Sequence, residues 1–216
     1  MGFLKYFCEK LDGKDCQDCS FSGIRRGVCR DRELGLKWNK ITRFNLTKNK
    51  SFFDEMAEWS NDEGIRRFIS SNMPINELVY SFIDKKHDCD FDDKCNLFFC
   101  FNESGDFVGF TYITAPNKFN SSAMIEYLVV NPKYRNCGIG TRMIKSVLTN
   151  EKYFNNGFKC EGVMTTIESL NIASYKAFSN NGFDVVSSNW GGDGRNYKVL
   201  KFLSKEDVDN ENEMSK

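Results

Sequence analysis

The stretch from Met124 to Asn150, MIEYLVVNPKYRNCGIGTRMIKSVLTN, decides the fold of this chain. Its first part, residues 125–130, is a β-branched and aromatic run that stops at Pro132, which is typical of a buried strand. Its last part repeats apolar residues at the 3.6-residue spacing of one helix face, at Ile139, Met143, Ile144, Val147 and Leu148. The stretch therefore predicts a strand, a tight turn and a helix, with Asn150 outside the buried face.

The turn between that strand and helix, residues 135–140, has the composition of an anion site. Gly138 and Gly140 carry no Cβ to keep a ligand from the backbone, and the first N–H groups of a helix have no partner within the helix. A dinucleotide fingerprint needs a third glycine where Met143 stands, and a nucleoside-triphosphate loop needs a lysine where Thr141 stands. Both of those phosphate loops are excluded.

The turn resembles the signature Arg/Gln-x-x-Gly-x-Gly/Ala of the GNAT superfamily of N-acetyltransferases. Residues 171–183, NIASYKAFSNNGF, resemble a second superfamily pattern, Asn-x-x-Ser/Ala-x-x-x-Tyr-x-x-x-Gly-Phe. Residues 53–68 are similar to the first-helix pattern of a branch with ribosomal-protein N-terminal, polyamine and aminoglycoside acetyltransferases. The resemblance covers residues 40–204 and implies transfer of an acetyl group from acetyl-CoA to a primary amine by direct attack.

Apolar runs and turn residues divide the remainder of the chain into further elements. Helices are expected to begin near residues 51, 74 and 139, and one more spans 171–180. Strands are expected at 41–46, 96–101, 107–113, 124–130, 162–167, 183–186 and 197–202. This order predicts an α+β class, and the resemblance implies the GNAT fold, a mixed, mostly antiparallel central sheet flanked by helices.

In the family that the chain resembles, the pyrophosphate of acetyl-CoA sits on the amides of the turn and the pantetheine arm lies along the preceding strand. Strand N–H groups near Val129 and Val130 would stabilise the oxyanion of the attacked thioester. Asn171 matches an asparagine that contacts the pantetheine arm. The resemblance implies these cofactor-binding residues: Leu128, Val129, Val130, Arg135, Asn136, Cys137, Gly138, Ile139, Gly140, Thr141, Asn171, Ser174 and Phe178.

The reaction needs a base, because an alkyl amine with a pKa of about 10.4 is almost entirely protonated at neutral pH. Glu126 is the candidate, since strict alternation along its strand puts it on one face with Leu128 and Val130. An ion pair with a nearby lysine or arginine is the alternative role for Glu126.

The departing thiolate raises a second question, because Phe178 stands where most members carry a tyrosine that protonates it. Phenylalanine has no proton to donate. Tyr175, one helical turn earlier, is a candidate substitute, with core packing as its alternative role. The sequence therefore also allows a catalytically impaired acyl-CoA-binding sensor or adaptor that uses a cysteine-rich arm for docking.

Composition divides the chain into three regions. Residues 1–38 form a cysteine-rich extension, 39–204 the acetyltransferase domain and 205–216 an acidic tail that we expect to be disordered. Within the extension the thiolates of Cys8, Cys16, Cys19 and Cys29 would suit a Zn²⁺ ion or an iron–sulfur cluster, or would remain reduced thiols.

The chain has nine cysteines, an odd number that favours a reducing compartment, the cytoplasm, over a secreted disulfide framework. Thirty basic and thirty acidic residues leave no net charge, which argues against a nucleic-acid partner. The longest apolar run, 97–101, is too short to cross a membrane. The identity of the amine and the oligomeric state do not follow from the sequence.

Overall fold

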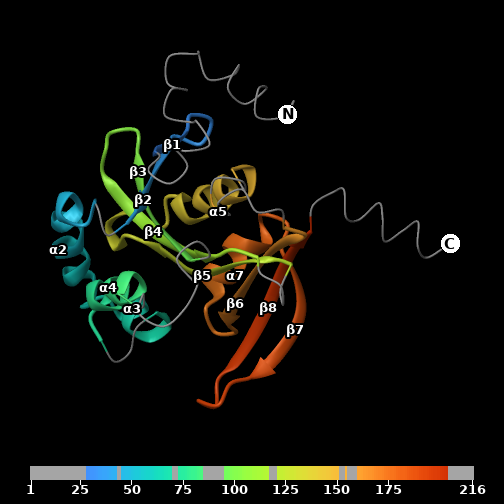
Figure 1. Cartoon of the computed structure of the whole chain (residues 1–216). Coiled ribbons are helices and arrows are strands. Elements are labelled where there is room, and N and C mark those ends of the chain that lie inside the picture. Colours follow the sequence, from blue (N-terminus) through green and yellow to red (C-terminus); the bar gives the residue numbers. More distant parts are fainter. Residues whose placement is uncertain are drawn as a thin grey trace.

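The computed structural model describes residues 28–42, 45–69, 73–84, 95–116, 121–150, 154 and 160–203 (Figure 1). Its centre is a sheet of eight strands in the order β1-β2-β3-β4-β5-β6-β8-β7. The strands are β1 (Val28–Asp31), β2 (Leu36–Ile41), β3 (Cys95–Asn102), β4 (Phe107–Thr114), β5 (Ala123–Val130), β6 (Gly162–Glu168), β7 (Asp184–Trp190) and β8 (Asn196–Leu203). The helices described are α2 (Lys50–Trp59), α3 (Glu63–Phe68), α4 (Ile75–Asp84), α5 (Ile139–Thr149) and α7 (Ile172–Ser179), with short 3₁₀ turns η3 (Thr47–Asn49) and η5 (Pro132–Tyr134).

The sheet is antiparallel at every junction except one. β5 and β6 run parallel, and the chain between them passes through α5. A parallel pair needs such a crossover, whereas the antiparallel pairs β1–β2, β3–β4 and β7–β8 are joined by short connections; β2 and β3 are instead connected through α2, α3 and α4. This mixed, mostly antiparallel sheet flanked by helices confirms the predicted α+β class.

Both faces of the sheet are covered, so the strands at its centre are apolar throughout. Helices α2, α3 and α4 pack on one face around Phe99 and Phe110, and α5 and α7 pack on the other around Phe98 and Ile125 (Figure 1). Successive residues of a strand point to opposite faces, so Phe98 and Phe99 enter different cores. This explains why the run 97–101 is apolar without alternation.

The structure corrects the predicted boundary of the N-terminal extension at residue 38. Residues 28–38 supply β1 and the start of β2, and Trp38 pairs with Cys100 of β3. Trp38 is fully buried, and its indole Nε1 donates to Ser146 Oγ of α5 at 2.9 Å. The strands escaped detection because each is short and because a tight turn at Gly35, with φ of 63°, joins them directly.

Some predicted features fall outside the described residues. Cys8, Cys16, Cys19, the acidic tail and most of the loop after α4 lie there, while Cys29 belongs to β1 and pairs with Trp38. In the described parts of the chain, no group of three histidine, cysteine or acidic side chains could hold a metal ion. The predicted zinc site therefore gains no structural support.

The expected first strand, 41–46, is displaced toward the N-terminus. The observed strand, β2, ends at Ile41, and Leu46 already has helical backbone angles before η3. Because β2 is an interior strand between β1 and β3, its apolar residues Leu36, Trp38 and Ile41 are spread over two cores. No helix among the described residues has the length and apolar character needed to cross a membrane.

The buried face of α5 agrees with the predicted one at Ile139, Met143, Ile144 and Val147. Leu148 is half-buried, and Asn150 is buried although it was expected outside this face. The Asn150 side chain donates to Ser146 O at 2.9 Å and to Asp31 Oδ2 at 3.0 Å. It thus closes the end of α5 and joins it to β1, an element that the sequence reading had placed in the extension.

Candidate active site

The central feature of the site is the point where β5 and β6 stop pairing. Their ladder ends with Ile125 opposite Thr165, whose hydroxyl donates to Ile125 O at 3.0 Å. Beyond this pair β5 continues to Val130 beside β4, and β6 continues to Glu168 beside β8. We call the diverging segments, residues 126–130 of β5 and 166–168 of β6, the strand opening.

The register of β4 and β5 fixes which backbone groups face the strand opening. Asn131 N donates to Val108 O at 2.9 Å, so Asn131 forms a hydrogen-bonded pair with β4. Such pairs alternate along an antiparallel ladder, so Val129 also directs its N–H toward β4, while Leu128 and Val130 direct theirs away from it. The Val129 N–H group therefore points into the sheet toward β4, contrary to expectation. The N–H groups that face the opening are those of Leu128 and Val130.

The turn after β5 is fixed by a fully buried asparagine. Asn131 Oδ1 accepts from Lys133 N at 3.1 Å, and its Nδ2 donates to Phe107 O at 2.9 Å and to Glu55 Oε1 of α2 at 2.8 Å. One side chain thus holds η5, β4 and α2 together directly after Val130. The sequence reading did not single it out, because an Asn-Pro pair is also an ordinary end to a strand.

Two residues with positive φ then lead the chain into α5. Asn136 has φ of 60° and Gly138 has φ of 73°. Since a Cβ on Gly138 would meet no heavy atom within 4 Å, the backbone angle rather than lack of space calls for glycine there. The cysteine between them, Cys137, has an exposed thiol.

The N-terminus of α5 presents backbone amides beside the strand opening. The first helical hydrogen bond of α5 runs from Arg142 N to Gly138 O at 3.0 Å, so the N–H groups of residues 138–141 precede the helical ladder. Ile139 buries its side chain in the core and offers only its backbone, and Thr141 O accepts from Asn181 at 3.2 Å. A Cβ on Gly140 would make an ordinary 3.4 Å contact with Val130 Cγ2.

The side chain of Arg135 is turned toward α3. Its Nη1 lies 2.8 Å from Asp62 Oδ1, and Asp62 caps α3 by accepting from Ile65 N at 2.9 Å. Burial opposes ionisation of Asp62, but the hydrogen bonds from Ile65 and Arg135 and the charge of Arg135 outweigh it and hold the pKa of Asp62 below its ordinary value. A Cβ on Gly64 would stand 3.2 Å from both partners, so glycine leaves room for the pair.

Glu126 lies on the face opposite to the predicted one. Tyr112 pairs with Tyr127 and Ile113 with Ile125, so Glu126 is the extra residue of a β-bulge. The bulge shifts the alternation, and Glu126 accepts from Thr114 Oγ1 at 3.3 Å, whereas Leu128 and Val130 pack toward α5. Glu126 is exposed, and this prediction of a shared face was wrong because it assumed a regular strand.

Three aromatic rings line the same face as Glu126. Phe82 of α4 stacks on Tyr112 with ring centres 4.1 Å apart and lies 5.0 Å from the Tyr127 ring. Burial, together with the charge of Glu126, raises the pKa of Tyr127. The sequence reading missed this aromatic wall, since α4 approaches β4 and β5 only in the folded chain.

The residues predicted on α7 make their contacts within the helix and with β8 and Phe183. Asn171 Oδ1 caps α7 by accepting from Ser174 N at 3.2 Å, so its Nδ2 group stays outside the cap. Phe178 is 4% exposed and meets the Phe183 ring edge to face at 5.0 Å. Tyr175 is half-buried, with Lys198 Nζ 4.3 Å from its ring centre, which fits its alternative role in packing.

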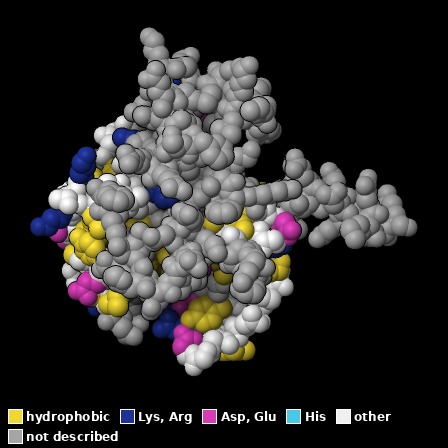
Figure 2. Space-filling view, viewed as in Figure 1, with side chains coloured by type: hydrophobic (Ala, Val, Ile, Leu, Met, Phe, Trp, Pro, Cys, Tyr) yellow, Lys and Arg dark blue, Asp and Glu magenta, His cyan; other side chains and the backbone are white. Residues whose placement is uncertain are grey.

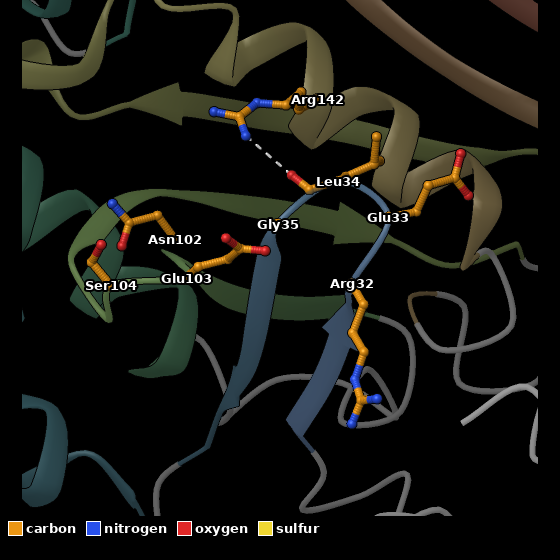
Figure 3. A pocket seen from close by; sticks show the side chains of 8 residues that line it. All are labelled: Arg32, Glu33, Leu34, Gly35, Asn102, Glu103, Ser104 and Arg142. Atoms are coloured by element: carbon orange, nitrogen blue, oxygen red, sulfur yellow. Dashed lines mark hydrogen bonds between the residues drawn. The ribbon is translucent and has the colours of Figure 1, made fainter. Parts of the chain in front are cut away.

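A separate hollow of about 420 Å³ lies between the turns β1–β2 and β3–β4 and helix α5 (Figure 3). Arg142 Nη1 donates there to Leu34 O at 3.1 Å, and the Glu103 carboxyl stands against Gly35. Acidic and basic side chains share its walls. None of the residues predicted from the sequence lines it, so it is distinct from the strand opening.

Residues 53–183 match the model of the Acetyltransferase (GNAT) family. The matched segment is more than half of the chain and contains the strand opening, the turn at residues 135–140, which we call the glycine turn, and α7, so the chain belongs to this family. It is an acetyl-CoA-dependent N-acetyltransferase, and its fold is the GNAT fold.

Solved structures support the same fold. Spermidine N-acetyltransferase from Vibrio cholerae in complex with CoA and spermine is similar with a TM-score of 0.60 and 14% identity, over 81% of this chain and 98% of that one. A dodecameric structure of spermidine N-acetyltransferase from Vibrio cholerae gives a TM-score of 0.55 and 13% identity, over 82% and 98%. Among curated proteins, none matches the sequence.

Proposed function

We propose that the chain transfers the acetyl group of acetyl-CoA to a primary amine by direct attack, without a covalent enzyme intermediate. The observation that supports this most is the proximity along the chain of two sets of backbone donors. Leu128 and Val130 face the strand opening, and the N-terminus of α5 begins eight residues further on, at Gly138. In acetyl-CoA, the thioester would need the donors of the strand and the pyrophosphate would need those of the helix N-terminus.

The turn at residues 135–141 would hold the pyrophosphate of acetyl-CoA through main-chain N–H groups. Positive charge for this anion comes from the end of the helix, because the Arg135 guanidinium is engaged with Asp62. Arg135 is thus a positioning residue that fixes α3 beside the turn. The Nδ2 group of Asn171 is the donor at α7 that would meet the pantetheine arm.

In the reaction, the amine nitrogen forms a bond to the thioester carbon and the carbonyl oxygen becomes an oxyanion. The N–H group of either Leu128 or Val130 would stabilise that charge, because the two groups are about 7 Å apart along the strand and one oxyanion reaches only one of them. The C–S bond then breaks and the thiolate leaves, which a thiol pKa of about 8.5 makes tolerable without an acid. Glu126 would relay the proton that the amine loses, directly or through water.

The acceptor that this site suits is a small cationic amine. Glu126 offers a carboxylate and Phe82, Tyr112 and Tyr127 offer aromatic faces on the side of the sheet away from α5. Carboxylates and aromatic faces both attract ammonium groups. The spermidine N-acetyltransferases of similar fold agree with this class. Neither the fold nor the comparisons favour the alternative of an impaired acyl-CoA sensor. We also propose that the reaction takes place in the cytoplasm.

An amine panel tests the proposal. Purified protein would be mixed with acetyl-CoA and alkyl monoamines, diamines and polyamines, and released CoA would be measured with the acetylated product identified by mass. We expect turnover with alkyl amines and none without an acceptor. A protein that binds acetyl-CoA by calorimetry yet acetylates no amine, and no N-terminus or lysine of a test peptide, would contradict the proposal.

A further inference from the structure

The turn between β7 and β8 sends one arginine across to the helical layer. Arg195 Nη1 donates to Glu168 Oε2 at 3.1 Å and to Arg67 O at 3.1 Å. Glu168 is the last residue of β6, and Arg67 lies in the last turn of α3. Arg195 therefore joins the hairpin, the strand opening and α3 at one nitrogen.

The Glu168 carboxylate lies on the same face of the sheet as Glu126. Val163 and Ile167 of β6 pack into the core beneath α5, so Glu168, one residue after Ile167, points to the other face. The shared contact with Arg67 O of α3 places it there independently. Two carboxylates thus stand on the two strands that border the opening, Glu126 on β5 and Glu168 on β6.

Their separation follows from the strand register. The ladder between the two strands ends at Ile125 opposite Thr165, so Glu126 follows the last pair by one residue and Glu168 follows it by three. Two residues of strand rise about 7 Å, and paired strands lie about 4.8 Å apart, so the two backbone positions are about 8 Å or more apart. A linear diamine can extend over such a distance, with one nitrogen near Glu126 and the other near Glu168.

We propose that Arg195 determines acceptor selectivity: its guanidinium occupies the Glu168 carboxylate in the free enzyme, and the second cationic group of a diamine or polyamine acceptor takes its place. This inference rests on the proposed acetyl transfer. The guanidinium is a cationic N–H donor. Its contacts therefore indicate that Glu168 and the carbonyl of Arg67 are suited to bind another cationic N–H donor, such as an ammonium group.

The exposures of the two side chains suit an exchange. The Glu168 side chain is 10% exposed, whereas that of Arg195 is 43% exposed. An ion pair with one exposed partner adds little stability, so displacing Arg195 would reduce acceptor affinity by about fivefold at most. A sheltered carboxylate, by contrast, is screened less by salt and holds an incoming ammonium group more firmly.

Most contacts that shape the hairpin do not involve the Arg195 guanidinium, whose Nε lies 3.6 Å from Asp193 Oδ2 in an exposed ion pair that adds little stability. Asp193 Oδ1 accepts from the backbone N of Arg195 at 3.0 Å, and Tyr197 donates its hydroxyl to Asp193 Oδ2 at 2.7 Å. Basic, acidic and hydrophobic side chains lie close together around this hairpin end (Figure 2). Replacing the Arg195 side chain should therefore leave the turn folded.

Steady-state kinetics with cadaverine and pentylamine test the inference, because the two amines differ in one ammonium group. Arg195→Gln should lower KM for cadaverine about fivefold and leave its kcat and the KM for pentylamine unchanged. Glu168→Gln should raise KM for cadaverine at least tenfold and leave pentylamine unaffected. In the Glu168→Gln background, Arg195→Gln should have no further effect. Lys145→Gln, which removes a remote cation paired with Glu33, is the control for net charge.

Other outcomes separate this inference from the proposed function. A higher KM for both amines in Arg195→Gln would mean that Arg195 only braces α3, and would overturn the inference. The same KM for cadaverine and pentylamine in the wild type and in all variants would also overturn the inference, but it would leave the proposed acetyl transfer intact. A wild-type protein that acetylates neither these amines nor any other would refute the proposed function itself.

Discussion

Arg135 Nη1 and Asp62 Oδ1 are 2.8 Å apart and join the glycine turn to the start of α3. The arginine belongs to the turn that would bind acetyl-CoA, and the aspartate caps a helix on the side of the sheet where we propose that the acceptor binds. Together with the contact of Asn131 with Glu55, this ion pair fastens the turn to the helices on the other face of the sheet, between residues separated by 73 positions in the sequence.

Asp62→Ala should destabilise the protein by about 1–2 kcal/mol, because it removes both the helix cap and the partner of Arg135. Asp62→Asn should cost less, since asparagine is also a good N-cap and only the charge is lost. Urea unfolding of the three proteins measures the difference. Equal losses for both variants would show that the charge, and not the cap, carries the stabilising effect.

The same carboxylate predicts a pH dependence. The pKa of Asp62 is lowered in the folded state, so its ionised form stabilises the fold. This contribution is fully present above the unfolded pKa of about 3.9 and is lost as the pH falls toward the lower folded value. The stability difference between wild type and Asp62→Asn should stay constant from pH 7 to about pH 5 and shrink below about pH 4. A difference that vanishes already near pH 6 would contradict this assignment.

Gly140→Asp should separate folding from cofactor binding. Its Cβ would contact only Val130 at 3.4 Å, and a negative charge at a helix N-terminus is favourable, so the variant should fold. The carboxylate would repel the pyrophosphate and weaken acetyl-CoA binding by about 100-fold (two contacts of about 1.5 kcal/mol each). Calorimetry measures the affinity. Gly192→Asp is the control, since a Cβ there meets nothing within 4 Å. Unchanged affinity in folded Gly140→Asp would exclude this turn as the pyrophosphate site.

The sequence was informative where local pattern and fold agree. The strand, turn and helix of residues 124–150 each depend on neighbours in the chain, and the predicted helix face is buried at four of its five positions, with Leu148 half-buried. The family motifs then identified the fold. β1 was missed and β2 was displaced, because Trp38 is buried by distant parts of the chain, including Phe98 of β3 and Ser146 of α5, the latter more than 100 positions away.

The site was less predictable, because it depends on irregularities and on contacts between distant elements. Alternation assigned Glu126 to one face, and a single bulge moved it to the other. The commitment of Val129 N–H to β4 follows from a register that the sequence does not reveal. Arg195 carried no motif at all, since its importance comes from reaching Glu168 and Arg67 across the opening.

Glu126→Gln should lower kcat/KM by about 100-fold, the usual effect of removing a general base, and should shift the ascending limb of the pH–rate profile. The amide keeps the acceptor oxygen for Thr114 but cannot take a proton. Glu103→Gln, in the separate hollow, is the matched control and should retain full activity. If Glu126→Gln kept the wild-type rate and profile, water or another carboxylate would have to be the base.

Phe178→Tyr tests whether the missing acid matters. The Phe178 ring is 4% exposed and packs edge to face on Phe183, so an added hydroxyl would enter an apolar core. Without a partner there, it should destabilise the fold by about 1–3 kcal/mol. The rate should hardly change, because a thiolate with a pKa of about 8.5 leaves without help. Thermal unfolding and kcat would be measured together. A large gain in kcat would mean that the hydroxyl reaches the thiolate and that the wild-type enzyme lacks an acid it needs.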